Sequence, residues 1–173
     1  PNNVTLTLAG DFDVAEAKSL IEKYFGEIPS GPAVEERQSR PGVLSENISL
    51  YHEDSFATVP RLTLVWPTVD QFHDDALVLD VLSEYLSTGK RAPLNEVLID
   101  EQKLTSSVAT FYYGKELAGE FYLFVDANAG GDLNALKPAL RSAFQRFEQN
   151  GISQADLDRI RAGQEVEIYD RWQ

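Results

Sequence analysis

Three stretches in the first part of the chain alternate apolar and polar residues, as half-buried strands do. They are residues 4–9, 48–52 and 61–66. The first stops at Gly10 and Asp11, a pair that favours a turn. In the third, Pro67 is expected to close the strand because proline donates no ladder hydrogen bond. This last strand carries one apolar face, made of Leu62, Leu64 and Trp66.

Helical periodicity predicts several helices between these strands and the end of the chain. Asp13, three residues before Glu16, is a capping-box-like start for a helix that ends at Gly26. Apolar residues at helical spacing then indicate helices over residues 77–88, 94–102, 132–150 and 153–169. Pro138 is tolerated only in a first turn, so the helix that contains it is expected to begin a few residues late.

A β-hairpin is predicted between these helices, with strands at residues 107–113 and 120–128. Residues 114–119 form its loop, which we expect to be longer than the tightest hairpin turns. Together with the other elements, the hairpin indicates an α+β fold in which helices cover one face of an antiparallel sheet.

The composition changes at Pro29, where proline, glycine, serine and charged residues replace the periodic pattern. Such a stretch is typical of a linker. We therefore predict three parts: residues 1–28, a linker at 29–46, and a domain at 47–173. A chain without methionine does not begin at a natural start, so we expect an excised segment.

The overall charge narrows the range of partners. Fifteen basic and 28 acidic side chains give a net charge of −13, which disfavours nucleic acids and anionic membrane surfaces. No apolar run reaches the roughly 20 residues that span a bilayer. Without cysteine, the chain has no disulfide, thiolate zinc site or cysteine nucleophile.

Residues 1–13, with the helix that ends in Tyr24-Phe25-Gly26, resemble the end of the catalytic domain of pitrilysin/insulinase-type zinc peptidases. The segments that follow are similar, in the same order, to the first strand, helix pair and hairpin of the family's second, non-catalytic domain. These segments are residues 61–68, 79–90, 94–104 and 116–121. The resemblance implies a LuxS/pitrilysin-like two-layer sandwich, truncated here at both ends.

Catalysis in this family depends on a His-x-x-Glu-His helix, in which two imidazoles hold Zn²⁺ and the glutamate activates the bound water. The histidines of this chain, His52 and His73, do not have that spacing. The family order places the zinc ligands upstream of Pro1. We therefore predict no catalytic, cofactor-binding or metal-binding residue in this fragment, and zinc in the parent protein.

Members of the family also carry an arginine and a tyrosine that donate hydrogen bonds to the substrate backbone. The resemblance puts Ile99 and Ser106 at these positions. Neither side chain supplies the positive charge or the phenol that the role needs. This departure agrees with a second domain of the N-terminal half.

Other polar features are better explained by structure than by function. His52 and His73 are interpreted as surface or helix-start residues, and the acids Asp74 and Asp75 as partners of a helix dipole. Gly130-Gly131 lacks a P-loop lysine and is interpreted as a turn. The Gly89-Lys90 turn is a weak candidate for substrate contact. The hairpin aromatics alternate between inward and outward positions. The outward set is a candidate for contact with a partner domain or a peptide, but we prefer to interpret the cluster as a sheet face packed under the helices: Phe111, Tyr112, Tyr113, Phe121, Tyr122 and Phe124.

The function implied by the resemblance is a non-catalytic domain that helps to wall the peptide chamber of a zinc metalloendopeptidase, without enzyme activity of its own. An alternative is a peptide-binding module that adds an extended peptide to a free sheet edge. A complete enzyme of another kind is a third hypothesis.

The expected partners are the preceding catalytic domain, the other half of the parent peptidase and a peptide substrate. Residues 4–9 are predicted to fill a vacant sheet position, either within the molecule or in a second copy as a strand-swapped homodimer. Family habit favours a periplasmic or secreted location over a cytoplasmic one.

Overall fold

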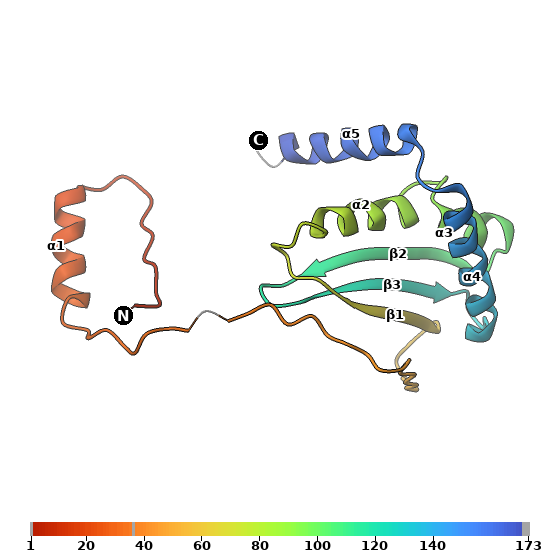
Figure 1. Ribbon diagram of the computed structural model, residues 1–173, viewed down its shortest axis with the longest axis horizontal. Coiled ribbons are helices and arrows are strands. Elements are labelled where there is room, and N and C mark those ends of the chain that lie inside the picture. The colour runs from red at the N-terminus through yellow and green to blue at the C-terminus, as the bar shows by residue number, and fades with distance from the viewer. Residues whose placement is uncertain (1, 36, 171–173) are drawn as a thin grey trace. The chain divides into compact units, whose positions relative to one another are not determined.

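The computed structural model describes residues 2–35 and 37–170 and divides into two compact units, Pro1–Gln38 and Ser39–Gln173. The division falls inside the stretch 29–46 that the sequence analysis interprets as a linker. Figure 1 traces both units along the chain, and each is described by itself below.

The first unit contains the helix α1 (Val14–Phe25). Asp13 caps it, because its Oδ1 accepts the backbone N–H of Glu16 at 2.8 Å. The predicted strand at residues 4–9 is not formed; these residues are extended and exposed. Alternation makes a strand only where a neighbouring strand takes up the backbone hydrogen bonds.

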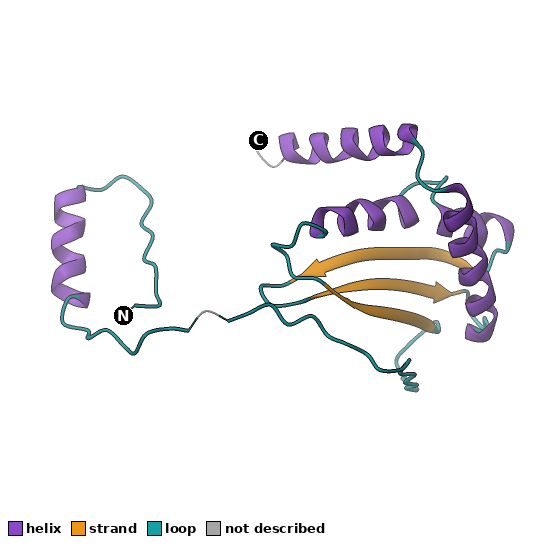
Figure 2. Cartoon of the chain, in the orientation of Figure 1, coloured by secondary structure: helices purple, strands orange, loops and turns teal. Residues whose placement is uncertain are grey.

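The second unit is built on a three-stranded antiparallel sheet in the order β1-β3-β2 (Figure 2). Its strands are β1 (Arg61–Thr68), β2 (Thr105–Gly114) and β3 (Gly119–Ala127). The β2–β3 loop, residues 115–118, is shorter than the predicted 114–119 but still longer than the tightest hairpin turns. The N–H of Lys115 donates to the carbonyl of Ala118 across it at 2.9 Å. The three strands of this sheet do not include residues 4–9, and their predicted insertion within one molecule stays a prediction. Exchange between two copies stays a prediction.

Helices lie on one side of this sheet, and the predicted α+β fold is confirmed (Figures 1 and 2). Helix α2 packs on β2, and α5 lies beyond α2. The predicted helix at 94–102 is present as two pieces, a short α-helical segment followed by a π-helical turn. The elements are α2 (Ala76–Ser87), α3 (Pro93–Asn95), the π-helical turn η1 (Glu96–Glu101), α4 (Leu133–Asn150) and α5 (Gln154–Asp170).

Pro138 lies inside α4, so the expectation of a late helix start is wrong. The helix begins at Leu133, where the carboxylate of Asp132 accepts the N–H of Asn134 at 2.8 Å. Pro138 leaves the carbonyl of Asn134 without its helical hydrogen bond. Both residues are exposed, so water can satisfy this carbonyl.

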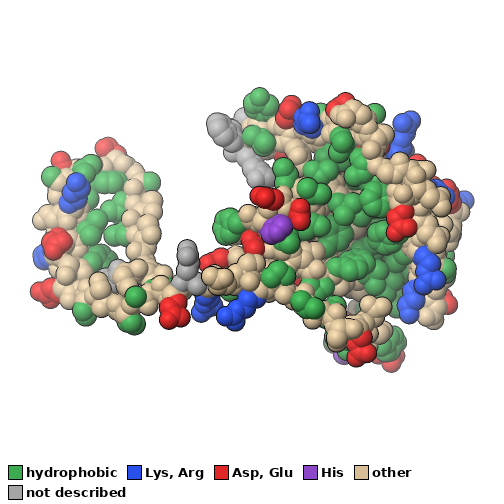
Figure 3. All heavy atoms as spheres, viewed as in Figure 1, with side chains coloured by type: hydrophobic (Ala, Val, Ile, Leu, Met, Phe, Trp, Pro, Cys, Tyr) green, Lys and Arg blue, Asp and Glu red, His purple; other side chains and the backbone are tan. Residues whose placement is uncertain are grey.

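The hydrophobic core fills the space between the sheet and the helices, where Figure 3 shows hydrophobic side chains gathered. Leu123 and Val125 of β3 are fully buried there, as are Leu94, Val97 and Leu98. One face of α4 completes the layer with Leu136, Ala139, Leu140 and Ala143. Apolar residues at helical spacing on α4 and at alternate positions on β3 thus meet in one core.

The segment before β1 does not form the strand predicted at residues 48–52. Ile48 is 68% exposed and Leu50 is 91% exposed. Although apolar and polar residues alternate here, these residues make no ladder with β1 in the part of the chain that the structure describes.

The outer edge of β1 is free of ladder hydrogen bonds among the described residues. The carbonyl of Pro60 accepts the N–H of Ala127 at 2.8 Å. This bond identifies which residues of β1 direct their backbone groups toward β3, because hydrogen-bonded and non-hydrogen-bonded pairs alternate along an antiparallel ladder. The backbone groups of Leu62, Leu64 and Trp66 face β3, and those of Arg61, Thr63, Val65 and Pro67 face outward. The missing N–H of Pro67 therefore costs the ladder nothing, and β1 runs on to Thr68 instead of ending at Pro67.

The outer edge of β2 differs, because a helix satisfies part of it. The N–H of Thr110 donates to Ser87 Oγ on α2 at 3.1 Å. The hydroxyl of Thr110 also donates to the carbonyl of Ser83 at 2.7 Å. The two sheet edges are therefore unequal, because among the described residues the outward groups of β1 make no ladder hydrogen bond.

The alternation of inward-facing and outward-facing backbone groups along β1 predicts different losses of stability when proline replaces two neighbouring residues. Thr63→Pro removes an outward N–H and should change the free energy of unfolding by less than about 1 kcal/mol. Leu64→Pro removes an N–H that β3 uses and should destabilise the domain by about 3 kcal/mol or more. Urea unfolding of both variants, with Thr63→Ala and Leu64→Ala as side-chain controls, measures the difference. Equal losses at the two positions would contradict this alternation.

Candidate functional site

The two histidines do not build a metal site. His52 is exposed in the segment before β1. His73 lies before α2, where its Nδ1 accepts the N–H of Asp75 at 3.1 Å. Within residues 2–35 and 37–170 no group of three or more His, Asp and Glu side chains is placed to hold a metal ion. The donor side chains among these described residues therefore do not fit a zinc site.

Ile99 and Ser106, the residues aligned with the family's arginine and tyrosine, lie in different environments. Ile99 is partly buried in η1 and packs against the core. Ser106 is exposed at the irregularity near the start of β2. An apolar core contact and a small hydroxyl at a bulge do not reproduce a pair of substrate-clamping donors.

The remaining candidates from the sequence occupy turns and helix starts. Asp75 is the residue before the first turn of α2, and Asp74 beside it is exposed. The carbonyl of Gly89 accepts a hydrogen bond from Asn95 Nδ2 at 2.7 Å. Gly130 has a φ of +73°, a backbone conformation that favours glycine.

The face of the sheet opposite the helices carries a ladder of three stacked aromatic rings. The Phe111 ring centroid lies 5.0 Å from that of Tyr122 and 5.5 Å from that of Phe124. Tyr122 and Phe124 are 5.6 Å apart and nearly parallel, with an interplanar angle of 4°. These three residues are not packed under the helices, so that interpretation is wrong for them. It holds for Phe121, whose side chain faces the core.

The stacked arrangement determines what this face can contact. Because the rings stack on one another, each ring covers part of its neighbours' surface. Phe111 remains 41% exposed and its neighbour Tyr113 is 52% exposed. Val65 on β1 adds an exposed aliphatic side chain to the same face. The result is a continuous apolar ridge, a kind of surface that commonly marks an interaction site.

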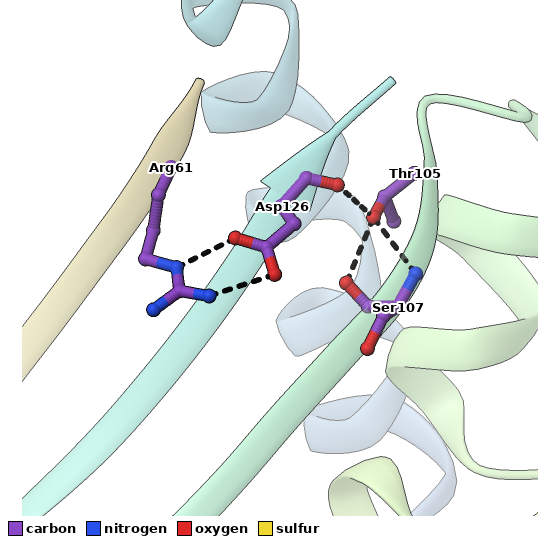
Figure 4. Close-up of polar contacts among 4 residues, drawn as sticks. All are labelled: Arg61, Thr105, Ser107 and Asp126. Carbon is purple, nitrogen blue, oxygen red and sulfur yellow. Dashed lines mark hydrogen bonds and ion pairs between the residues drawn. The ribbon is translucent and has the colours of Figure 1, made fainter. Parts of the chain in front are cut away.

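An ion pair closes one end of the ridge (Figure 4). The guanidinium of Arg61 makes two bonds to the carboxylate of Asp126, with Nε at 2.6 Å and an Nη at 2.9 Å. It also lies 5.8 Å from the ring centre of Phe124, close enough for a cation–π contact. The hydrogen bond from Arg61 lowers the pKa of Asp126. The same hydrogen bond raises the pKa of Arg61. Arg61 is therefore a positioned cation whose charge is neutralised.

The backbone beside this ion pair is held by Thr105. Its hydroxyl accepts the N–H of Ser107 at 3.0 Å and lies within hydrogen-bonding distance of the carbonyls of Asp126 and Ser107. These contacts span the register shift between Thr105 and Ser107, where β2 departs from regular pairing with β3. Figure 4 shows how they fix β2 against the strand that carries Asp126.

A second charged group closes the other end of the ridge. Lys115 Nζ lies 3.1 Å from Glu120 Oε2, and the hydroxyl of Tyr122 donates to the same oxygen at 2.9 Å. The hydrogen bond from Lys115, followed by that from Tyr122, lowers the pKa of Glu120. The same contact with Glu120 raises the pKa of Lys115 and of Tyr122.

Two shallow hollows adjoin the ridge. One, of about 280 Å³, is lined by Arg61, Ser107, Ala109, Phe124 and Asp126. The other, of about 440 Å³, lies between residues 40–44 and the end of β1. Apolar surface flanked by paired charges favours noncovalent binding of a chain over a chemical step.

The ion pairs of this face, Arg61 with Asp126 and Lys115 with Glu120, are not among the residues predicted from the sequence. Arg61 and Asp126 are 65 positions apart, and they meet because antiparallel pairing puts them opposite each other. The available signal was a cation at the start of one predicted strand and a carboxylate near the end of another. Using it requires the strand order, in which β3 lies between β1 and β2.

Comparison with known proteins gives consistent matches over most of the chain. The family model of the peptidase M16 inactive domain matches residues 1–164. The zinc protease PqqE of Helicobacter pylori is 24% identical over 97% of this chain, which spans 38% of that protein. The chain thus covers well under half the length of this curated relative.

Solved structures show the same fold. A protease from Helicobacter pylori matches with a TM-score of 0.65 and 21% identity, over 93% of this chain and 40% of its own. The peptidase M16 inactive domain from Pseudomonas fluorescens matches with a TM-score of 0.63 and 21% identity, over 91% of this chain and 37% of its own. The family model, the sequence relative and the fold agree with one another and with the resemblance read from the sequence. This chain belongs to the peptidase M16 inactive-domain family.

Proposed function

We propose that this domain serves as a non-catalytic wall of a zinc metallopeptidase, in which another domain supplies the zinc and the catalytic residues. The open aromatic face of the sheet carries this proposal. It presents an apolar ridge of Phe111, Tyr122 and Phe124 between two neutralised ion pairs. Such a surface contacts an extended peptide without fixing its sequence.

Charge neutralisation supports a role in peptide contact. Arg61 is paired with Asp126, and Lys115 with Glu120, so the ridge ends carry little net charge despite the acidic chain. A peptide of either sign can then approach the apolar ridge without strong repulsion from these groups. The partners proposed for the parent protein are its catalytic domain, its other half and a peptide substrate. A periplasmic or secreted location remains part of the proposal.

Substitutions in the full-length protein test the wall function. Phe111→Glu puts a charge on the open ridge and should lower kcat/KM for an apolar peptide at least about tenfold, mainly through KM, because uniform binding is lost. Phe72→Glu makes the same change at a site that is 75% exposed and outside the sheet, and it should leave kcat/KM unchanged.

Zinc content and circular dichroism of both variants show whether they are intact. Equal kinetics for Phe111→Glu and the unsubstituted protein, with both intact, would refute the proposed role of the ridge.

The second candidate is a peptide-binding module of a catalytically inactive relative, and the free edge of β1 favours it. The N–H groups of Arg61, Thr63 and Val65 face outward, whereas Ser87 caps the corresponding edge of β2 at Thr110. An extended peptide adds to a sheet at such an edge through main-chain hydrogen bonds.

Hydrogen exchange of the isolated chain tests this second candidate. A saturating peptide should slow exchange of the outward amides Thr63 and Val65, while the already paired amides Leu62 and Leu64 stay as they were. Thr63→Pro, which removes one outward donor, should weaken peptide binding. Unchanged exchange at Thr63 and Val65 would count against strand addition.

A further inference from the structure

The larger hollow on the open side of the sheet is a groove with a distinct composition. One wall is the segment 40–44, the floor is the end of β1, and the β2–β3 turn closes one end. Its volume of about 440 Å³ falls within the range of small-ligand pockets. The lining residues used below are Arg40, Leu44, Val65, Lys115, Ala118 and Glu120.

The wall of the groove is attached to the β2–β3 turn. The N–H of Arg40 donates to the carbonyl of Leu117 at 2.6 Å, and the hydroxyl of Ser39 donates to the same oxygen at 3.3 Å. Gly42 passes Pro67 so closely that an added Cβ would lie 3.2 Å from the proline Cβ. These contacts hold the backbone of residues 39–42 beside the hairpin and the end of β1, and Arg40 is one of the residues that line the groove.

The groove combines apolar surface with local positive charge. Val65 and Leu44 line it with side chains that are 42% and 51% exposed, so a ligand can remove more of their apolar surface from water. Lys115 and Glu120 neutralise each other. The lining contains two cationic side chains, Arg40 and Lys115, and one carboxylate, Glu120, so one cation is in excess among the lining residues.

We propose that this groove binds the C-terminal residue of a peptide, with its apolar side chain on Val65 and Leu44 and its free carboxylate at Arg40. The guanidinium matches the planar, two-oxygen geometry of a carboxylate. The apolar wall and the cation lie in one small space, so both groups should come from one residue. An aspartate or glutamate side chain carries the charge but not the apolar group. This inference rests on the proposed function only in that the parent handles peptides.

Nuclear magnetic resonance of the isotope-labelled 173-residue chain tests the groove directly. The probes are acetyl-Ala-Ala-Leu with a free carboxylate and the same peptide as a C-terminal amide. The free acid should shift the amide signals of Ala118 and Gly119 and the methyl signals of Val65 and Leu44. It should bind at least about tenfold more tightly than the amide, because a charge-assisted bond is lost in the amide.

Two arginine variants separate a specific contact from a change in net charge. Arg40→Gln should reduce binding of the acid to the level of the amide. Arg37→Gln makes the same charge change three residues earlier, at a position that does not line the groove, and should leave binding unaltered. Equal affinity for acid and amide, insensitivity to Arg40→Gln, or no shifts at several millimolar peptide would each overturn the proposal. The binding measurement involves neither zinc nor catalysis. A negative result would therefore refute the groove proposal alone, whereas the wall function is tested by the kinetics of the full-length protein.

Discussion

The central position of β3 is the constraint on which the second unit depends. Hydrogen bonds to β1 on one side and to β2 on the other fix which way each of its side chains points. Leu123 and Val125 are consequently held in the core with no exposed surface, and Tyr122 and Phe124 are held on the opposite face. A shift of one residue would exchange these sets, exposing the aliphatic core residues and burying a tyrosine hydroxyl. The pairing register of β3 with its two neighbours therefore determines both the core and the open aromatic ridge.

The same pairing makes the two edges of the sheet unequal. On β2 a hydroxyl from α2 takes the outward N–H of Thr110, so part of that edge is occupied by the domain itself. On β1 the outward groups remain accessible, and Pro67 falls at a position where its missing N–H is harmless. Free strand edges invite pairing with another chain. In a domain that handles peptides such an edge is useful, whereas elsewhere it would favour aggregation.

Helices and the hairpin were predictable from the sequence because their signals are local. Asp13 and Glu16 mark a helix start within four residues, and the alternation around Tyr122 reports a strand with two different faces. Residues 4–9 and 48–52 carry the same alternation without forming strands, since a strand also needs a partner that no local pattern reveals. The position of Pro138 inside α4 was not predictable in this way, because the cost of its missing hydrogen bond depends on whether water reaches the freed carbonyl. The contact of Arg61 with Asp126 required the strand order.

The described residues present an apolar ridge, a free strand edge and a groove, and no group of three or more His, Asp and Glu side chains among them is placed to hold a metal ion. Binding surface and metal chemistry are therefore expected to be separate in this protein. Zinc stoichiometry, measured together with peptidase activity on the 173-residue chain and on the full-length protein, tests that separation most directly. The account predicts a metal-free, inactive fragment and a full-length protein with one zinc that cleaves peptides and loses activity on chelation. Stoichiometric zinc on the fragment, or a full-length protein without zinc, would contradict it.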